Sequence, residues 1–144
     1  MSWEDIYFDR KLTDGEVVHA LSQFFEVQPE QVLIQHGHTS LGDVDDHILV
    51  VRGVFAKEGD FPTLLEVIPL KKEMLPTDRH GSVGRLCELL ESHALIFYEG
   101  DTNPYTGVFV RKKNDYQQVV LDHDLLDLDD EQITIIEYCE RLDY

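Results

Sequence analysis

The chain is short of cysteines, of long apolar runs and of basic residues, and each shortage excludes a class of protein. Only Cys87 and Cys139 are present, and they form neither a CxxC pair nor a disulfide framework. We therefore expect both to be small buried side chains in a reducing cytosol. No apolar run approaches the ~20 residues of a membrane span, and the first residues lack the basic and apolar regions of a signal peptide. These absences predict a cytoplasmic protein.

Basic residues are scarce relative to acids. The 144 residues include 29 acids and 12 bases, which gives a formal net charge of −17. Because Lys and Arg drive binding to nucleic acids, this balance argues against a nucleic-acid ligand, and the same sign disfavours anionic membrane surfaces. A net charge of about 2–8 is enough to keep a small domain soluble. The excess favours a basic protein as the partner, and solubility alone is the competing explanation.

The motifs of common enzyme classes are also missing. Neither GxxxxGK[ST] nor GxGxxG occurs, and Ser82 has no GxSxG context. Residues 79–85 form a basic segment at a helix start, the kind of place that binds anions, but they carry neither phosphate motif. A capped helix whose arginines pair with nearby acids is the favoured interpretation. We expect no enzymatic activity and no cofactor.

Histidines and acids are concentrated in a loop at residues 36–47. The set comprises His36, His38, Asp43, Asp45, Asp46 and His47. Zinc accepts such nitrogen and oxygen ligands, and a metal-dependent enzyme that uses His36, His38 and Asp45 is one alternative function. The metallo-hydrolase pattern HxHxDH is absent, however, because Ser40 and Leu41 stand in place of its Asp and His. A polar loop with Asx-type turns is favoured, and we predict no metal site.

Apolar periodicity predicts two helices and one uncertain closing segment. Thr13 and Glu16 fit a capping box at the start of the first helix, which ends near Val27. Ser82 is the predicted cap of the second helix. Residues 131–142 fit either a helix or a strand, and the spacing of isoleucines and Cys139 favours a helix.

The remaining pattern predicts one α+β domain over residues 1–144. Strands are expected at residues 31–35, 48–55, 62–68, 94–98, 107–113 and 116–122. The β-branched run at 48–55 is the best candidate for a central strand, and residues 2–10 are expected to be an edge strand or a packed arm. The order α-β-β-β-α-β-β-β-α has short hairpin connections. It indicates a largely antiparallel sheet with two to three helices packed on one face.

The most distinctive stretch is residues 122–131, DHDLLDLDDE, in which six of the ten residues are acids. Asp129, Asp130 and Glu131 would suit the positive end of a helix that follows them. The other acids are interleaved with leucines, and we expect Leu125 and Leu128 to anchor the segment in the core. The acids would then be displayed along a fixed edge. The predicted partner-binding residues are Asp122, Asp124, Asp127, Asp129, Asp130 and Glu131, with Asp43, Asp45 and Asp46 as a second contact.

In its small size, acidity, lack of catalytic motifs and the segments DHDLLDLDDE and GDVDD, the chain resembles the cytosolic immunity proteins of bacterial contact-dependent and other polymorphic toxins. The resemblance is to a functional class and includes no alignable motif. It implies a small α/β or α+β domain that binds the catalytic domain of a toxin, often a basic nuclease, and blocks its substrate. A small α+β adaptor or regulatory domain is the second hypothesis, and the metal-dependent enzyme is the third. The sequence does not determine the partner or the oligomeric state.

Overall fold

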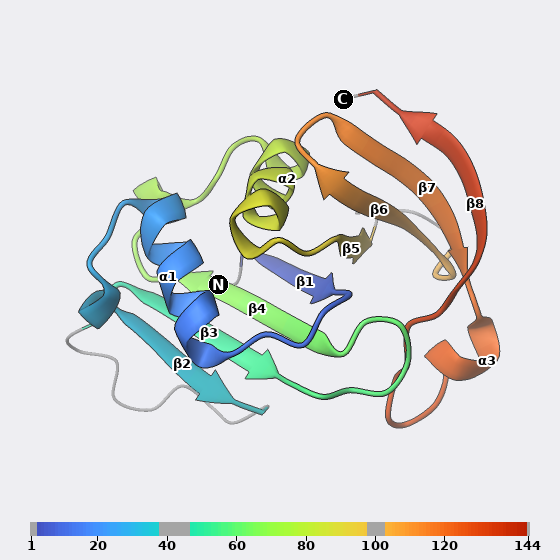
Figure 1. Ribbon diagram of the computed structural model, residues 1–144, viewed down its shortest axis with the longest axis horizontal. Helices are drawn as coiled ribbons and strands as arrows, with labels where there is room; N and C mark the ends of the chain where they lie inside the picture. Colours follow the sequence, from blue (N-terminus) through green and yellow to red (C-terminus); the bar gives the residue numbers. More distant parts are fainter. Residues whose placement is uncertain (1–2, 38–46, 98–102, 144) are drawn as a thin grey trace.

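The computed structural model describes residues 3–37, 47–97 and 103–143, and within these ranges the chain forms one eight-stranded sheet and three α-helices (Figure 1). The strands are β1 (Glu4–Phe8), β2 (Val32–His36), β3 (Leu49–Val54), β4 (Thr63–Pro69), β5 (Ala94–Phe97), β6 (Thr106–Lys112), β7 (Asp115–Leu121) and β8 (Ile135–Leu142). Their order across the sheet is β2-β3-β4-β1-β5-β6-β7-β8. Only β2 and β3, among these neighbouring pairs of described strands, are parallel. The predicted α+β class with a largely antiparallel sheet is confirmed.

The first helix, α1 (Asp14–Phe25), begins where the sequence predicts. The Thr13 hydroxyl oxygen accepts from the Glu16 N–H at 3.2 Å, and the Glu16 carboxylate accepts from the Thr13 N–H at 3.2 Å. These two bonds form the capping box and satisfy backbone donors that the first turn leaves free. Glu26 ends the helix in the left-handed conformation, shortly before Pro29.

The second long helix, α2 (Arg79–Leu90), begins earlier than predicted. Its N-cap is Asp78, whose carboxylate accepts from the Gly81 N–H at 3.1 Å, and Ser82 lies inside the helix. The prediction of a Ser82 cap is therefore wrong. Asp caps helices as well as Ser does, and the backbone of Asp78 is already extended, as an N-cap requires. The helix therefore starts at Asp78, four residues before Ser82.

Both long helices lie on the same face of the sheet, and the larger core lies between them and the sheet (Figure 1). Successive strand residues point to opposite faces, so Ile6 and Phe8 of β1 join this core while Tyr7 points away from it. A second core forms on the other face. It consists of Tyr7, Phe61, Leu95, Phe109, Val119, Leu121 and Ile133.

The positions of β1 and β3 in the sheet differ from those predicted. β1 pairs with β4 on one side and β5 on the other, so it is an interior strand and neither an edge strand nor an arm. β3 is the second strand from one end, despite its strongly apolar sequence. β1 is short and begins with two acids, so its sequence does not indicate an interior strand, although Ile6 and Phe8 are completely buried. Strand order depends on pairing between distant segments, and composition does not encode it.

The closing segment is the strand β8, and the prediction of a helix there is wrong. β8 pairs with β7, with Val119 opposite Tyr138 and Leu121 opposite Ile135, and the register shifts twice along the pair. Each shift puts an extra residue into β8 and breaks the two-residue alternation of a strand. Because of these extra residues, the apolar residues of the closing segment are spaced like those of a helix. Cys139 is also only partly buried, in contrast to the buried Cys87.

A close contact between α2 and the β6–β7 hairpin holds the helix to the sheet. A Cβ atom at Gly84 would lie 2.6 Å from the backbone nitrogen of Lys113, so only glycine allows this approach. The hairpin turns at Asn114, which has a positive φ of 68°. None of the helices in the described part of the chain has the length and apolarity needed to cross a bilayer.

Candidate functional site

The acidic segment at residues 122–131 is folded into a closed loop. It contains the short helix α3 (His123–Leu126), which is capped by Asp122: its carboxylate accepts from the Asp124 and Leu125 N–H groups at 3.0 and 3.2 Å. The Asp122 N–H donates to the Thr134 carbonyl at 2.9 Å and so joins the two ends of the loop. Asp122 therefore has a structural role. The helix lies within the segment instead of following it.

Two further acids of the segment accept hydrogen bonds from tyrosines. Glu131 accepts from the Tyr7 hydroxyl at 2.5 Å, which connects the segment to an interior strand of the sheet. Burial, followed by this bond to Glu131, raises the pKa of Tyr7 well above its usual range, so Tyr7 remains a donor. Asp127 accepts from the Tyr105 hydroxyl at 2.9 Å, and that bond raises the pKa of Tyr105. Both carboxylates fix the loop in place.

The apolar anchors of the segment differ from the expected pair. Leu128 is 48% exposed, so it does not anchor the loop in the core as predicted. Leu126 packs against the second core instead, and Ile133 is completely buried within it. The Gln132 N–H donates to the Leu125 carbonyl at 3.1 Å. The expectation of a fixed acidic edge is met through different residues.

The remaining acids of the segment point outward. Asp124 and Asp130 have 87% and 84% of their side chains exposed, and Asp129 is exposed as well. Lys57 lies 3.8 Å from Asp130, but only 9% of its side chain is exposed. The surface that reaches solvent here is therefore acidic.

Sequence reasoning missed two acids that join this surface. The turn between β3 and β4, residues 55–62, lies beside the end of the acidic segment: the Asp60 N–H donates to the Ile133 carbonyl at 2.9 Å. Gln132 also donates to the Glu58 carboxylate at 3.1 Å, across 74 positions of the sequence. Glu58 and Asp60 are both exposed. In the sequence, only the two acids themselves distinguish this turn. Its contact with the acidic segment joins residues that are far apart in the sequence, so local sequence does not indicate it.

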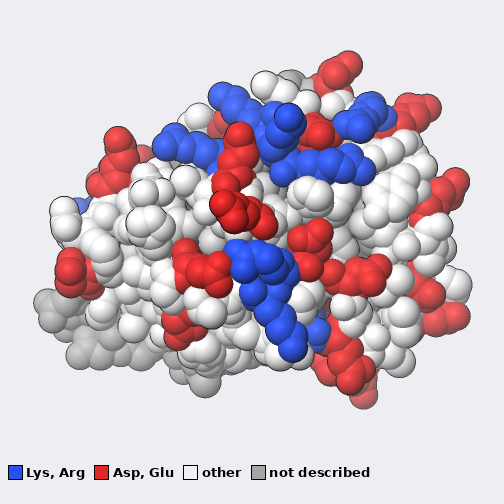
Figure 2. Space-filling model, in the orientation of Figure 1, with Lys and Arg blue, Asp and Glu red and all other residues white. Residues whose placement is uncertain are grey.

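Apart from Asp127, which is bonded to Tyr105, these two segments bring together five exposed acids, which we call the acidic surface. It consists of Glu58, Asp60, Asp124, Asp129 and Asp130. On the helix-bearing face of the molecule, basic side chains gather at the top and centre, where acidic side chains lie among them, and the right margin, where β8 and α3 lie, is mainly acidic (Figure 2).

The candidate ligands of the alternative metal-site hypothesis do not form a site among the described residues. His36 lies 2.9 Å from the Asp14 carboxylate, and its ring contacts Phe55. No group of three metal-ligating side chains occurs in residues 3–37, 47–97 and 103–143. His38 and the predicted second contact of Asp43, Asp45 and Asp46 lie outside the described residues.

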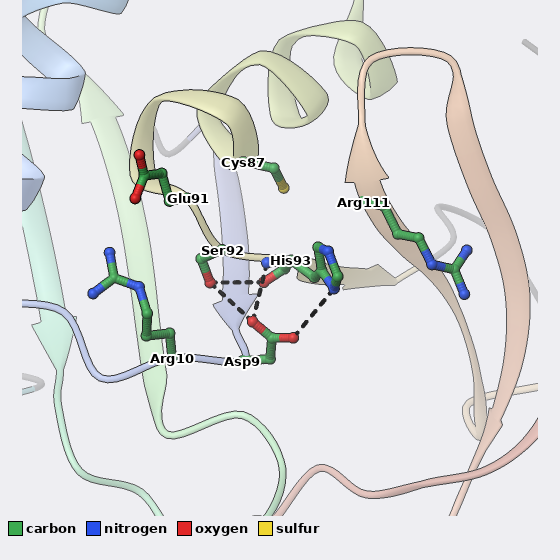
Figure 3. Close-up of a pocket in the computed structure, with 7 residues that line it drawn as sticks. All are labelled: Asp9, Arg10, Cys87, Glu91, Ser92, His93 and Arg111. Carbon is green, nitrogen blue, oxygen red and sulfur yellow. Dashed lines mark hydrogen bonds and ion pairs between the residues drawn. The ribbon is translucent and has the colours of Figure 1, made fainter.

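A polar cavity of about 400 Å³ at the ends of β1 and α2 holds the residue types of a hydrolytic triad (Figure 3). The Asp9 carboxylate accepts from the Ser92 hydroxyl and the His93 N–H, both at 3.0 Å, and lies 3.5 Å from His93 Nδ1. In a working triad, the serine hydroxyl would bond the imidazole, which would take its proton. Here the serine bonds the carboxylate. Arg10 and Glu91 also point away from His93 in Figure 3, so the cavity does not converge on a reacting atom.

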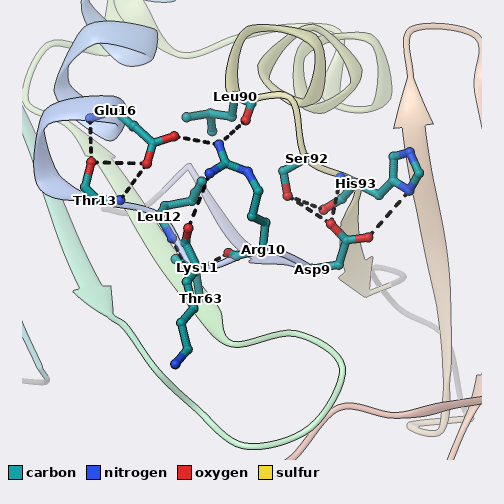
Figure 4. Close-up of polar contacts among 10 residues, drawn as sticks. All are labelled: Asp9, Arg10, Lys11, Leu12, Thr13, Glu16, Thr63, Leu90, Ser92 and His93. Carbon is teal, nitrogen blue, oxygen red and sulfur yellow. Dashed lines mark hydrogen bonds and ion pairs between the residues drawn. The ribbon is translucent and has the colours of Figure 1, made fainter.

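The side chains that line the cavity instead connect the sheet to both long helices (Figure 4). Arg10 donates to the Glu16 carboxylate at 2.6 Å and to the Leu90 carbonyl at 2.5 Å. The bond from Arg10 is the main cause of the lowered pKa of Glu16. Burial raises the pKa of the Cys87 thiol, which is therefore a poor nucleophile. The Asp9 carboxylate, the Ser92 hydroxyl and the terminal nitrogens of Arg10 thus have partners within the fold.

Comparisons of the chain with protein-family models, with curated proteins and with solved structures found no match. The function must therefore follow from the charge and geometry of the described surface.

Proposed function

We propose that this protein is an acidic binding protein that neutralises a basic protein partner. In its most specific form the proposal is an immunity protein that occludes the active site of a bacterial toxin, a nuclease domain. The observation that carries it is the acidic surface, in which exposed carboxylates from two distant segments are held on one folded edge. The residue types of the polar cavity give no support to an enzyme, because the Ser92 hydroxyl is bonded to Asp9.

The rigidity of the acidic surface favours binding. The loop is closed by the Asp122–Thr134 bond, tied to the sheet through Tyr7 and Glu131, and anchored by Ile133. Because these contacts order the carboxylates before binding, little conformational entropy is lost when a partner docks. A preformed row of negative charges also steers a basic partner and raises the association rate.

The proposed inhibition is occlusion. A nuclease binds phosphates through Arg and Lys in its cleft, and carboxylates satisfy the same donors with short, charge-assisted bonds. Asp124, Asp129 and Asp130 would occupy that cleft as a substrate mimic, with Glu58 and Asp60 at its border. Binding alone then prevents access of nucleic acid, and no chemical step is needed.

The test is affinity capture with the whole chain from a lysate of the organism that encodes it, at low salt, followed by elution with a salt gradient. We expect one basic protein to elute at moderate ionic strength. Its nuclease activity, measured after purification, should be lost in an equimolar mixture with this chain. A retained protein whose activity is unchanged by the chain would contradict inhibition, and failure to retain any basic protein would contradict the binding function itself.

A further inference from the structure

The large apolar side chains that the described structure leaves exposed are concentrated near the end of the chain. They are Leu70, Leu128, Ile136 and Tyr138. Ile136 and Tyr138, both on β8, are the most exposed of them, at 60% and 55%. Two such side chains on one strand are unusual where nothing covers them, because burying each would be favourable.

The strand that carries them projects from the end of the sheet. β8 is the last strand in the sheet order, and within the described part of the chain it pairs only with β7 (Figure 1). The Tyr138 ring stands edge-to-face against Phe109 at 5.9 Å, so one side of it rests on the second core while the other faces solvent. A tyrosine supported in this way loses little freedom on binding, as residues at the centre of interfaces do.

The same strand carries exposed acids. Glu137 lies between Ile136 and Tyr138, and Glu140 precedes Arg141, whose guanidinium pairs with Asp115. β8 therefore presents carboxylates close to its exposed apolar side chains. The strand lies beside α3 on the acidic margin of the molecule (Figure 2). A partner of complementary charge therefore meets apolar and acidic contacts together.

We infer that β8 is the apolar half of the partner-binding surface and that Ile136 and Tyr138 contact a basic protein segment that also carries apolar side chains. This inference rests on the proposed function, because it assumes a basic partner. Glu137 and Glu140 pair with the basic side chains, and the acidic surface supplies the longer-range attraction. The acids set the association rate, and the apolar contacts slow dissociation.

A second copy of the chain is a poor occupant of this strand. Pairing two β8 strands would bring together two molecules that each carry −17. The two register shifts along β8 also disturb the regular edge that strand-to-strand pairing needs. Recognition through side chains by a basic segment avoids both obstacles.

The test uses the whole chain and two synthetic peptides of equal length and charge. In one peptide lysine alternates with valine and leucine, and in the other lysine alternates with serine. Binding is followed by fluorescence anisotropy and by amide shifts of the isotope-labelled chain. We expect the apolar peptide to bind on the order of tenfold more tightly, with shifts in residues 135–142. The double variant Ile136→Ser/Tyr138→Ser should lose this preference but still bind both peptides.

Leu70→Ser is the matched control, because it removes an exposed apolar side chain elsewhere and should keep the preference. Equal affinity of the parent for the two peptides, or an undiminished preference in the double variant, would overturn the inference. A dimer in sedimentation that the double variant dissociates would overturn it as well, since a second copy would then cover β8. The proposed function has a separate test. It fails if replacing Asp124, Asp129 and Asp130 by Asn lowers the affinity of the chain for neither peptide.

Discussion

The Tyr7–Glu131 hydrogen bond connects the acidic segment to the interior of the sheet. Glu131 is one of six acids in a short stretch, yet its role differs from that of its neighbours: it holds the loop, as Asp122 and Asp127 do. Asp124, Asp129 and Asp130 are exposed. The acids of this segment thus divide into a supporting set and an exposed set, which is the binding set of the proposed function.

Removing charge from the binding set should weaken partner binding without affecting the fold. We expect Asp124→Asn/Asp129→Asn/Asp130→Asn to reduce affinity for the captured basic partner by on the order of tenfold or more and to flatten its salt dependence. The control Glu30→Gln/Glu73→Gln/Glu88→Gln removes three exposed charges elsewhere and should bind like the parent. Calorimetric titration at several salt concentrations provides the measurement. Equal losses in both triple variants would mean that net charge, and not this surface, governs binding.

The Tyr7 hydroxyl should contribute measurably to stability. Tyr7→Phe leaves the ring in the second core but deprives Glu131 of its donor, and we expect the free energy of unfolding to fall by about 1–3 kcal/mol. Urea denaturation gives the measurement. Tyr138→Phe, which removes an exposed hydroxyl, should change stability by less than about 0.5 kcal/mol. An unchanged midpoint for Tyr7→Phe would show that the bond does not hold the loop.

His80 should make stability depend on pH. Burial, then the charge of Arg79, lowers the pKa of His80 below its ordinary value of 6.5. The unfolded chain binds this proton more readily, so the stability is fully present above pH 6.5 and declines as the pH falls through the folded pKa. We expect the parent to lose more stability than His80→Gln between pH 7.5 and 5, measured by urea denaturation. Parallel pH profiles for the two proteins would contradict this assignment.

At the level of elements, α2 is held against the β6–β7 hairpin by a contact that admits no side chain. Alanine is the better helix former by about 1 kcal/mol, but at Gly84 its Cβ would lie 2.6 Å from the Lys113 backbone nitrogen. We expect Gly84→Ala to destabilise the protein by about 1–3 kcal/mol, because the hairpin must shift. Gly15→Ala in α1 meets no atom within 4 Å and should be neutral or stabilising. Thermal unfolding of both variants tests this, and a Gly84→Ala variant as stable as the parent would refute the close contact.

For the whole molecule, the net charge of −17 acts on folding and on binding in opposite ways. Salt screens the self-repulsion of the folded chain and should raise its melting temperature. The same screening weakens attraction to a basic partner, so affinity should fall over the same range of salt. Calorimetric unfolding and titration from low salt to about 0.5 M check both trends. Affinity that does not decrease with salt would exclude an electrostatic interface.

Features that depend on local chemistry could be predicted from the sequence. The capping box of Thr13 and Glu16 starts α1 through bonds only three residues apart, and the hairpin at Asn114 follows from turn chemistry. Most strands were predicted because alternation survives wherever pairing is regular. Net charge, and with it the expectation of a basic partner, comes from composition alone.

Contacts between distant segments could not be predicted from the sequence and are seen only in the folded chain. Pairing with β4 and β5 makes β1 an interior strand, and pairing with β7 makes residues 135–142 a strand whose two extra residues had imitated a helical period. Contact between two turns brings Glu58 and Asp60 to the acidic segment. Leu126, and not Leu128, packs against the second core and anchors that segment. The energy of such contacts depends on partners far away along the chain. Local sequence therefore marked the acids but not the surface that they form.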